Sequence, residues 1–319
     1  MQFDVRAIMG KLSRDEGRND TFREIIEETF HLVSGFSLED FFPSLGWLTS
    51  LLGMDERAKR NFRKWDAVLS QMIQEHLKRK EGNLNDDNFA DILLSLQQDP
   101  NTDITLTNDM LKVLLLDMFA AGTHTSYITL EWSMAELIRN PQVMKKLQNE
   151  VRGIATGKSM VKEEDLSEMH YLKAVIKETL CLYPPGPLLL PRQTIQSCEI
   201  EGYHIPGKTN VIINFWSIGR DPKFWGNADE FQPERFVNSP IDFKGLDYEF
   251  IPFGAGRRVC PGLLFAVSNL QLALANLVHR FDWKLPDYVK DEKEFDMTES
   301  PGIVLRMKKS LYLVPKPRF

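Results

Sequence analysis

The sequence predicts a mainly α-helical protein with small β-sheets. Apolar residues recur at helical spacing over much of the chain up to Leu182 and again after Pro261, and short apolar stretches between turn signals follow Leu188. The 319 residues, 43% apolar and 26% charged, can bury a sizeable core. Because no internal repeat or low-complexity linker divides the sequence, we expect residues 1–319 to form a single domain.

Four helices are predicted in the first 140 residues. The first two are amphipathic, and their apolar faces comprise Phe22, Ile25, Ile26, Thr29, Phe30 and Val33, and then Phe62, Trp65, Leu69, Met72, Ile73, His76 and Leu77. A polar break over 83–88 precedes a third helix over 89–96. The fourth, over 106–139, is apolar nearly all round between Met110 and Gly122, which predicts that its middle is buried.

The segment between the first two helices, residues 36–53, contains many large apolar side chains. These are Phe41, Phe42, Leu45, Trp47, Leu51 and Leu52. Large apolar groups in a loop favour contact with a membrane surface. The alternative is that they cap a pocket from inside the protein.

The second half predicts three more helices and several strands. Asn140 and Pro141 indicate the N-cap and first residue of a helix that ends near residue 153. Further helices are expected over 170–182, where a run of prolines stops the helix, and over 261–281. Small strands are expected after Leu188, and the tail is expected to form a strand pair from 303–307 and 311–314.

Charge and cysteine content exclude several classes of protein. A net charge of −6 gives no reason to expect a nucleic-acid partner. The three cysteines, Cys181, Cys198 and Cys260, are too few for a disulfide framework, which favours a reducing or cytosol-facing location. There is no run of about 18 apolar residues, so this chain is predicted to have no transmembrane segment. Its first residues also lack the apolar core of a signal peptide.

The segment 253–262, Phe-Gly-Ala-Gly-Arg-Arg-Val-Cys-Pro-Gly, carries the strongest chemical signal. Its three glycines permit a tight loop, and the helix predicted after it places Cys260 at a helix N-terminus. The helix dipole and the neighbouring Arg257 and Arg258 stabilise a thiolate there. Without nearby Cys or His partners this is not a zinc site. It suits an iron centre with one thiolate ligand, or a nucleophile.

This segment resembles the heme loop of the cytochrome P-450 family, Phe-x-x-Gly-x-Arg-x-Cys-x-Gly. Every fixed position is filled, by Phe253, Gly256, Arg258, Cys260 and Gly262. The resemblance implies the cytochrome P-450 fold, heme b as cofactor, and Cys260 as the axial thiolate that binds its iron. It also implies that Arg258 pairs with a heme propionate. Arg192 matches a second propionate contact, and the alternative for this residue is a solvated arginine. Such a thiolate pushes electron density onto iron and favours cleavage of the O–O bond.

A second motif lies in the long predicted helix. Residues 121–126, Ala-Gly-Thr-His-Thr-Ser, resemble the family segment that crosses the distal heme face, Ala/Gly-Gly-x-acid-Thr-Thr/Ser. Two catalytic residues are implied. Thr125 can hold water beside dioxygen, and His124, which replaces the family's acid, can relay protons near neutral pH. The alternatives are a kinked helix without chemistry and a histidine that is only a satisfied polar group.

A third motif departs from the family pattern. Glu178 and Cys181 occupy the place of the family's Glu-x-x-Arg, and residues 233–236, Pro-Glu-Arg-Phe, match the segment that supplies its partner arginine, Arg235. Because Cys181 has no guanidinium group, one charged partner of Glu178 is missing. We expect Glu178 and Arg235 still to pair.

The resemblance implies a monooxygenase, an oxidoreductase that inserts one atom of dioxygen into a small apolar substrate with electrons from a separate NADPH-dependent reductase. It is closest to plant members of secondary metabolism, located at the cytosolic face of the endoplasmic reticulum membrane. Candidate pocket residues, with core packing as the alternative for each, are Met118, Phe119, Leu188, Leu189, Gly302 and Ile303.

The chain begins just before the helix pair that roofs the family's substrate pocket, so we expect it to be truncated at its N-terminus, without the family's anchor and early helices. Membrane association would then belong to the full-length family and be weak or indirect here. Two alternatives stay open. One is a catalytically impaired remnant with weak or no heme binding, and the other is an enzyme that uses Cys260 as a nucleophile.

Overall fold

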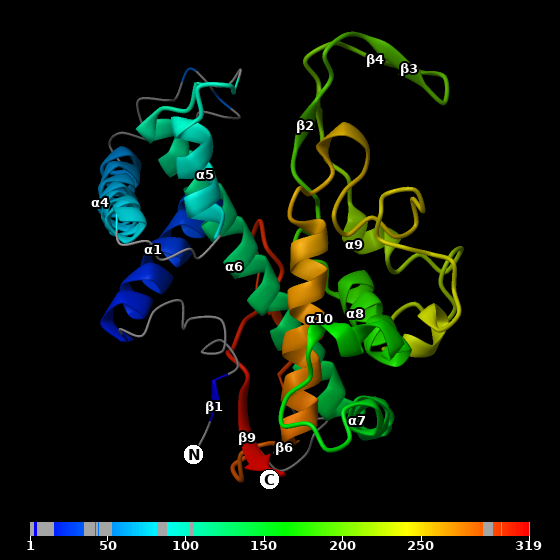
Figure 1. Cartoon of the computed structure of the whole chain (residues 1–319). Helices are drawn as coiled ribbons and strands as arrows, with labels where there is room; N and C mark the ends of the chain where they lie inside the picture. The colour runs from blue at the N-terminus through cyan, green and yellow to red at the C-terminus, as the bar shows by residue number, and fades with distance from the viewer. Residues whose placement is uncertain are drawn as a thin grey trace. The chain divides into compact units, whose positions relative to one another are not determined.

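The computed structural model describes residues 3–4, 16–34, 42, 44, 53–81, 88–102, 105–289, 296–300 and 302–318. Helices dominate it and the strands are short, which confirms the mainly α class (Figure 1). The chain divides into two compact units, Gly10–His124 and Met1–Met9 with Thr125–Phe319, and the two are described separately below. That residues 1–319 act as one domain stays a prediction.

The first unit is a group of helices: α1 (Glu16–Ser34), α4 (Met54–Glu81), α5 (Phe89–Gln98) and the N-terminal part of α6 (Asn108–Arg139). Its core combines the apolar faces of all four, namely Phe22, Ile25, Ile26, Trp65, Leu69, Ile73, Ala90, Leu93, Leu94, Leu111 and Leu115. The hydroxyl of Thr29 joins α1 to α4, because it accepts hydrogen bonds from Asn61 Nδ2 at 2.8 Å and Trp65 Nε1 at 2.9 Å.

Some predictions about buried faces in this unit are wrong. Val33, expected on the apolar face of α1, and Phe62 and Leu77, expected on that of α4, are exposed. In α6 the apolar stretch predicted to be buried exposes Met110, Val113, Leu114 and Met118, while Leu111 and Leu115 are buried. The described residues of this unit cover only one side of the helix, so an apolar sequence all round it does not produce burial all round.

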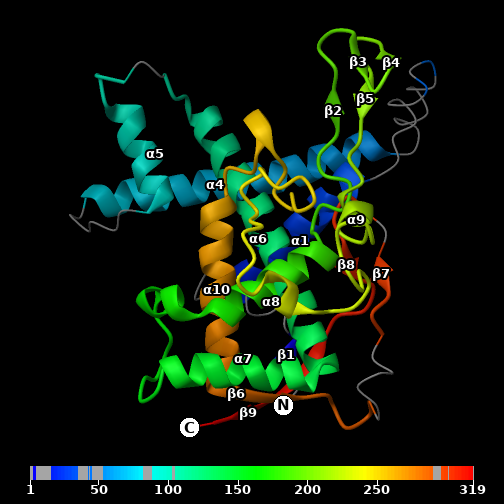
Figure 2. The same ribbon diagram turned by 90° about the vertical axis from the view of Figure 1, so that its right-hand side faces the viewer.

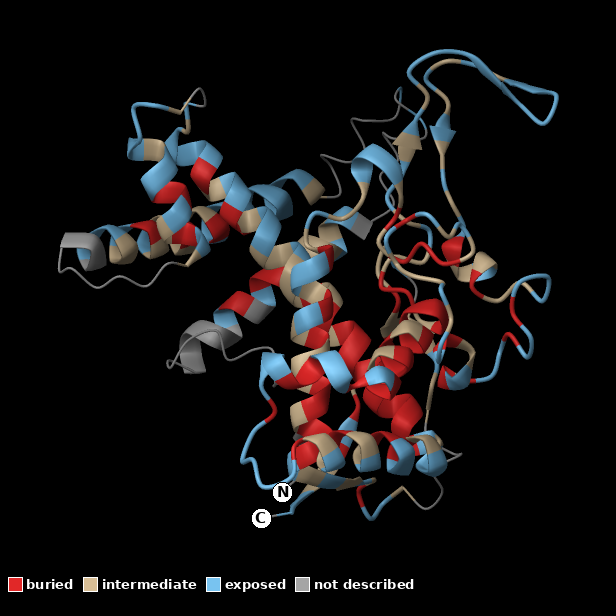
Figure 3. Ribbon diagram, turned by 45° about the vertical axis from the view of Figure 1, so that its right-hand side comes forward, coloured by how far each residue is buried: buried red, intermediate tan, exposed pale blue. Residues whose placement is uncertain are grey.

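The second unit contains the rest of α6 together with α7 (Pro141–Ile154), α8 (His170–Leu182) and α10 (Leu263–Arg280). The last three pack against one another (Figure 2). Every residue of 128–138 is buried, and the buried residues of this unit concentrate in this part of α6 and in α8 (Figure 3). Asn140 occupies the N-cap of α7 as predicted, but its side chain donates to Glu136 Oε2 at 2.9 Å instead of capping the helix.

The strands among the described residues form four small antiparallel groups. β1 (Phe3–Asp4), β9 (Tyr312–Pro317) and β6 (Phe281–Lys284) form a three-stranded sheet in that order. The two-stranded groups are β2 (Arg192–Gln193) with β5 (Asn210–Val211), β3 (Cys198–Ile200) with β4 (Tyr203–Ile205), and β7 (Glu299–Ser300) with β8 (Arg306–Met307).

The C-terminal strands do not pair as predicted. The expected pairing of 303–307 with 311–314 is wrong, because β8 pairs with β7 whereas β9 lies between β1 and β6. The last helix ends at Arg280, and Phe281 begins β6, where it lies opposite Pro317.

The aromatic segment 36–53 lies outside the described residues except for Phe42, Ser44 and Gly53. The Phe42 side chain is 54% exposed, and contact of this segment with a membrane stays a prediction. No helix among the described residues combines the length and the apolar character needed to cross a bilayer.

Candidate active site

The cysteine loop before α10 is closed by its own backbone. The N–H of Gly254 donates to Ile251 O at 2.9 Å, and the N–H of Cys260 donates to Phe253 O at 2.9 Å. Gly254 and Gly256 have φ of +74° and +68°, a conformation that residues with a Cβ rarely adopt. The glycines at these positions therefore allow the backbone to turn so that Cys260 lies beside Phe253.

Cys260 lies two residues before Gly262, the N-cap of α10, which confirms its predicted place at a helix N-terminus. The carbonyl of Cys260 accepts from the N–H of Leu263 at 3.4 Å. A Cβ on Gly262 would lie 3.8 Å from the Cys260 sulfur, so the glycine leaves that side of the sulfur open. The half-buried sulfur is thus accessible and lies at the positive end of the α10 dipole.

A second loop supports the first. Gly245, at φ +82°, lies so close to the cysteine loop that a Cβ there would lie 2.9 Å from Gly254 O. Phe243 packs edge to face on Phe253, with ring centroids 5.9 Å apart. Lys177 Nζ of α8 holds the supporting loop by donating to Ile241 O at 2.6 Å. The cysteine loop is therefore built on α8 as well as on α10.

The two arginines predicted to bind propionates lie together. Arg192 in β2 donates from Nη2 to the carbonyl of Arg258 at 3.2 Å, so its guanidinium reaches the cysteine loop. The side chains of Arg257 and Arg258 are exposed on the same loop. This arrangement provides one cysteine sulfur and several cations, which is the donor set that a heme with an axial sulfur ligand and two propionates requires.

The Glu178–Arg235 pair forms as expected, with Nε 2.9 Å from Oε2. Glu178 is fully buried and also accepts from the N–H of Gln232 at 2.8 Å. The rest of the Arg235 guanidinium donates to backbone carbonyls, from Nη1 to Gly226 at 3.0 Å and from Nη2 to Glu230 at 2.8 Å. Burial raises the pKa of Glu178 from 4.5 to about 8 even though Arg235 opposes that shift.

Cys181 serves a packing role in place of the family's arginine. Its thiol donates to Gly219 O at 3.4 Å. A Cβ on Gly219 would lie only 2.4 Å from Cys181 O, so α8 and the end of α9 (Phe215–Ile218) are in backbone contact here. Burial raises the pKa of the Cys181 thiol well above its usual range, which keeps it protonated.

The motif predicted to act on oxygen lies in the middle of α6. His124 is 1% exposed, and its ring stacks on Phe30 of α1 at 4.0 Å between centroids. Thr125 is half-buried, and its carbonyl accepts from Thr129 Oγ1 at 3.1 Å. A catalytic role for either residue stays a prediction.

The candidate pocket residues have mixed surroundings. Phe119 packs edge to face on Phe22 at 5.5 Å, which favours core packing for this residue. Met118 and Leu188 are exposed, and Leu189 adopts φ +50°, an unusual conformation for a residue with a Cβ. Gly302 is exposed and Ile303 is half-buried.

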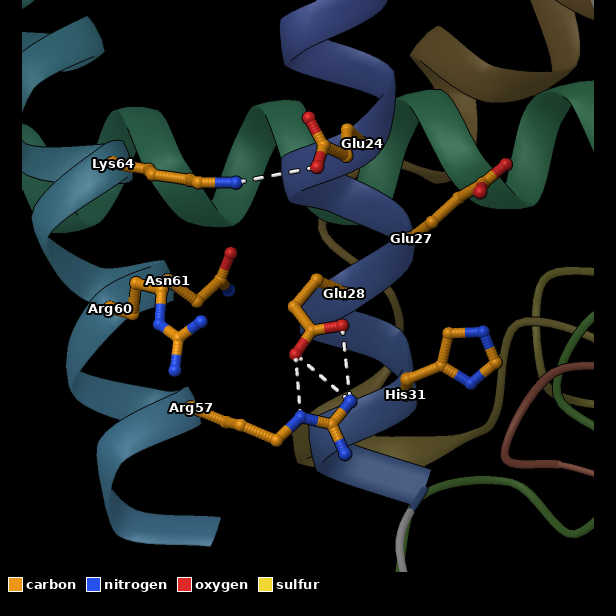
Figure 4. Close-up of a pocket in the computed structure, with 8 residues that line it drawn as sticks. All are labelled: Glu24, Glu27, Glu28, His31, Arg57, Arg60, Asn61 and Lys64. Carbon is orange, nitrogen blue, oxygen red and sulfur yellow. Dashed lines mark hydrogen bonds and ion pairs between the residues drawn. The ribbon is translucent and has the colours of Figure 1, made fainter. Parts of the chain in front are cut away.

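A different pocket lies between α1 and α4 of the first unit (Figure 4). Its lining is polar and mostly charged: Glu24, Glu27, Glu28, His31, Arg57, Arg60, Asn61 and Lys64. Ion pairs cross it between Lys64 Nζ and Glu24 at 3.4 Å and between Arg57 Nη2 and Glu28 at 3.0 Å. Such a lining is unsuited to an apolar molecule, so this pocket is not the predicted substrate site.

Comparison with known proteins decides the family. The family model of cytochrome P450 matches residues 5–314. The chain belongs to the cytochrome P450 family. It is 48% identical to cytochrome P450 71A1 of Persea americana over 310 residues, which are 96% of this chain and 62% of that protein. It is 46% identical to strychnine-11-hydroxylase of Strychnos nux-vomica, over 98% of this chain and 62% of that protein.

The fold is shared more widely within the P450 family. A zebra fish cytochrome P450, in a structure with progesterone, matches with a TM-score of 0.78 at 25% sequence identity, covering 98% of this chain and 70% of that chain. The plant relatives confirm the resemblance to plant A-type P450s. The chain spans about 62% of the length of these plant relatives.

Sequence reasoning missed several residues of this P450 site. Gly245 and Lys177 support the cysteine loop from distant positions, and Gly219 meets Cys181. The isolated glycines at 219 and 245 were visible in the sequence, but no local signal says which backbone approaches them. Phe30 as the partner of His124 had no sequence signal beyond its place on an apolar helix face.

Proposed function

We propose that this chain is the catalytic region of a heme-dependent monooxygenase that oxidises a small apolar molecule. The observation that carries the proposal is the cysteine loop. One half-buried sulfur lies at the start of α10, within a loop closed by the Cys260 to Phe253 hydrogen bond. Arg192 reaches the same loop through the carbonyl of Arg258. A cysteine that lies beside cations at a helix N-terminus is suited to serve as an anionic axial ligand of a metal.

Each residue of the site then has a role. Cys260 would bind the iron of heme b, and Arg192 and Arg258 would pair with its propionates. When bound, heme supplies the dioxygen chemistry, with electrons from a separate NADPH-dependent reductase. Thr125 would hold a proton at its hydroxyl for bound dioxygen. The protein would work at the cytosolic face of the endoplasmic reticulum membrane, as the resemblance to the P450 family implies.

The names of related proteins support a substrate class for this chain. One relative, 46% identical, is a strychnine-11-hydroxylase, and another, 44% identical, is the premnaspirodiene oxygenase of Hyoscyamus muticus. We infer that the substrate here is also a small plant secondary metabolite with a large apolar surface.

The test is oxygen labelling. The chain is combined with a plant NADPH-dependent reductase and a panel of apolar plant metabolites under ¹⁸O₂. The proposal expects a product that carries one ¹⁸O atom and is absent with the Cys260→Ala variant. Product that takes its oxygen from water, or that forms equally with Cys260→Ala, contradicts the proposal.

A second candidate function has one observation in its favour. Cys181 leaves the buried Glu178 with Arg235 as its charged partner within the described network, which favours an impaired remnant with weak heme binding. Heme bound per polypeptide separates the two candidates. A ratio near one supports the monooxygenase, and a ratio near zero in the intact chain supports the remnant.

A further inference from the structure

The turn of α6 that carries Thr125 contains a residue whose surroundings do not match proton relay. His124 is 1% exposed. Its imidazole lies face to face with the Phe30 ring, with centroids 4.0 Å apart and an angle of 16° between the planes. A relay residue exchanges its proton with water and changes orientation as it does so. Burial and stacking both oppose these movements.

Phe30 is itself held in place. Its neighbour Thr29 accepts hydrogen bonds from Asn61 and Trp65 of α4, and donates to Ile25 O at 2.8 Å. Two turns earlier on α1, Phe22 contacts Phe119 of α6, with ring centroids 5.5 Å apart. Phe22 with Phe119 and Phe30 with His124 therefore make two ring contacts along the same pair of helices. Two separated contacts fix both the position and the direction of α1 along α6.

We propose that His124 is a positioning residue, and that its stack on Phe30 fastens α1 to the turn of α6 that precedes Thr125. The inference rests on the proposed function. Thr125 is then the side chain of this motif that holds a proton. At the position where the family has an acid, this chain has a histidine ring that stacks on Phe30. The stack would hold in place the part of α6 that ends at His124, directly before Thr125 in the sequence.

The first test is a double-mutant cycle on the unfolding equilibrium of the chain, with Phe30→Leu, His124→Leu and the double variant. Leucine keeps an apolar group of similar volume, so the fold is retained. A direct ring contact predicts that the two changes are coupled by roughly two- to tenfold in the equilibrium constant. His124→Phe should restore the coupling to Phe30, and the stability, that His124→Leu loses. Additive effects, or no restoration by phenylalanine, overturn the proposal. This test needs no heme.

The second test measures product formed per NADPH consumed, in the reductase assay. Positioning predicts that His124→Phe, which keeps the stack, retains more of this ratio than His124→Asp, which restores the family's acid and removes the ring. The reverse order shows proton relay and overturns the proposal. The spectrum of the reduced, carbon-monoxide-bound unmodified chain is recorded alongside. Failure of the proposed function appears in that spectrum, whereas failure of the positioning role appears in the cycle.

Discussion

Cys181 shows how one residue changes a buried network without preventing it from forming. Glu178 still pairs with Arg235, but the guanidinium also satisfies the carbonyls of Gly226, Asn227 and Glu230. Burial has a larger effect on the pKa of Glu178 than the nearby charge of Arg235, and the pKa rises to about 8. A carboxyl with such a pKa is largely protonated at neutral pH, so Arg235 faces a mostly neutral partner.

This shift predicts a pH-dependent stability. The folded state holds a proton on Glu178, whereas the unfolded state releases it near the ordinary pKa of 4.5. The stability that this group contributes is therefore fully present below about pH 4.5 and is lost as the pH rises through about 8. A pKa difference of one corresponds to about 1.4 kcal/mol. The loss over this window is therefore roughly several kcal/mol.

Cys181→Arg should flatten that pH dependence, because a second cation beside Glu178 lowers its pKa. The measurement is urea unfolding at a series of pH values between 5 and 9. Cys181→Ala is the matched control, since it removes the thiol without adding charge and should keep the slope of the unmodified chain. Equal slopes for Cys181→Arg and Cys181→Ala would refute this account of Glu178.

Thr125→Ala should separate electron use from product formation. Proton transfer by a positioned group typically raises a reaction rate by about a hundredfold or more. The rate of product formation should therefore fall by up to about a hundredfold, while NADPH consumption falls much less. Thr125→Ser keeps the hydroxyl and should retain the ratio of product to NADPH. An unchanged ratio in Thr125→Ala would remove Thr125 from the proposed chemistry.

Helix α8 and the end of α9 meet at a contact that has no room for a side chain. A Cβ on Gly219 would lie 2.4 Å from Cys181 O, which is a backbone atom and cannot move aside as a flexible side chain could. Gly219→Ala should therefore destabilise the chain by about 1–3 kcal/mol, measured by urea unfolding. Gly226→Ala is the control, because a Cβ there meets nothing within 4 Å. Equal midpoints for the two variants would show that the contact relaxes at no cost.

Helical elements were predictable because their signal is local. The spacing of apolar residues and the prolines placed α8 at His170–Leu182 and located α4, α5 and α7 closely. Strand pairing was less predictable, since the partners of β8 and β9 depend on residues far away in the sequence. The exposed side of α6 at Met110 and Met118 was missed because an apolar pattern does not say how many neighbours cover a helix.

For the molecule as a whole, the site divides into a local part and an assembled part. The cysteine loop spans ten consecutive residues, so its glycines, arginines and cysteine predicted its chemistry directly. Its supports at Lys177, Arg192 and Gly245 come from separate segments. Arg192 was found through the family pattern, whereas Lys177 and Gly245 required the folded chain. The family assignment over residues 5–314 agrees with the local motifs.

The central claim is that Cys260 is the thiolate that binds heme iron, and the most direct test is the absorption spectrum of the reduced, carbon-monoxide-bound chain. The three cysteines are changed to alanine one at a time. The account predicts a strongly red-shifted Soret band in the unmodified chain that persists in Cys181→Ala and Cys198→Ala and disappears in Cys260→Ala. Retention of the red-shifted band in Cys260→Ala would contradict it.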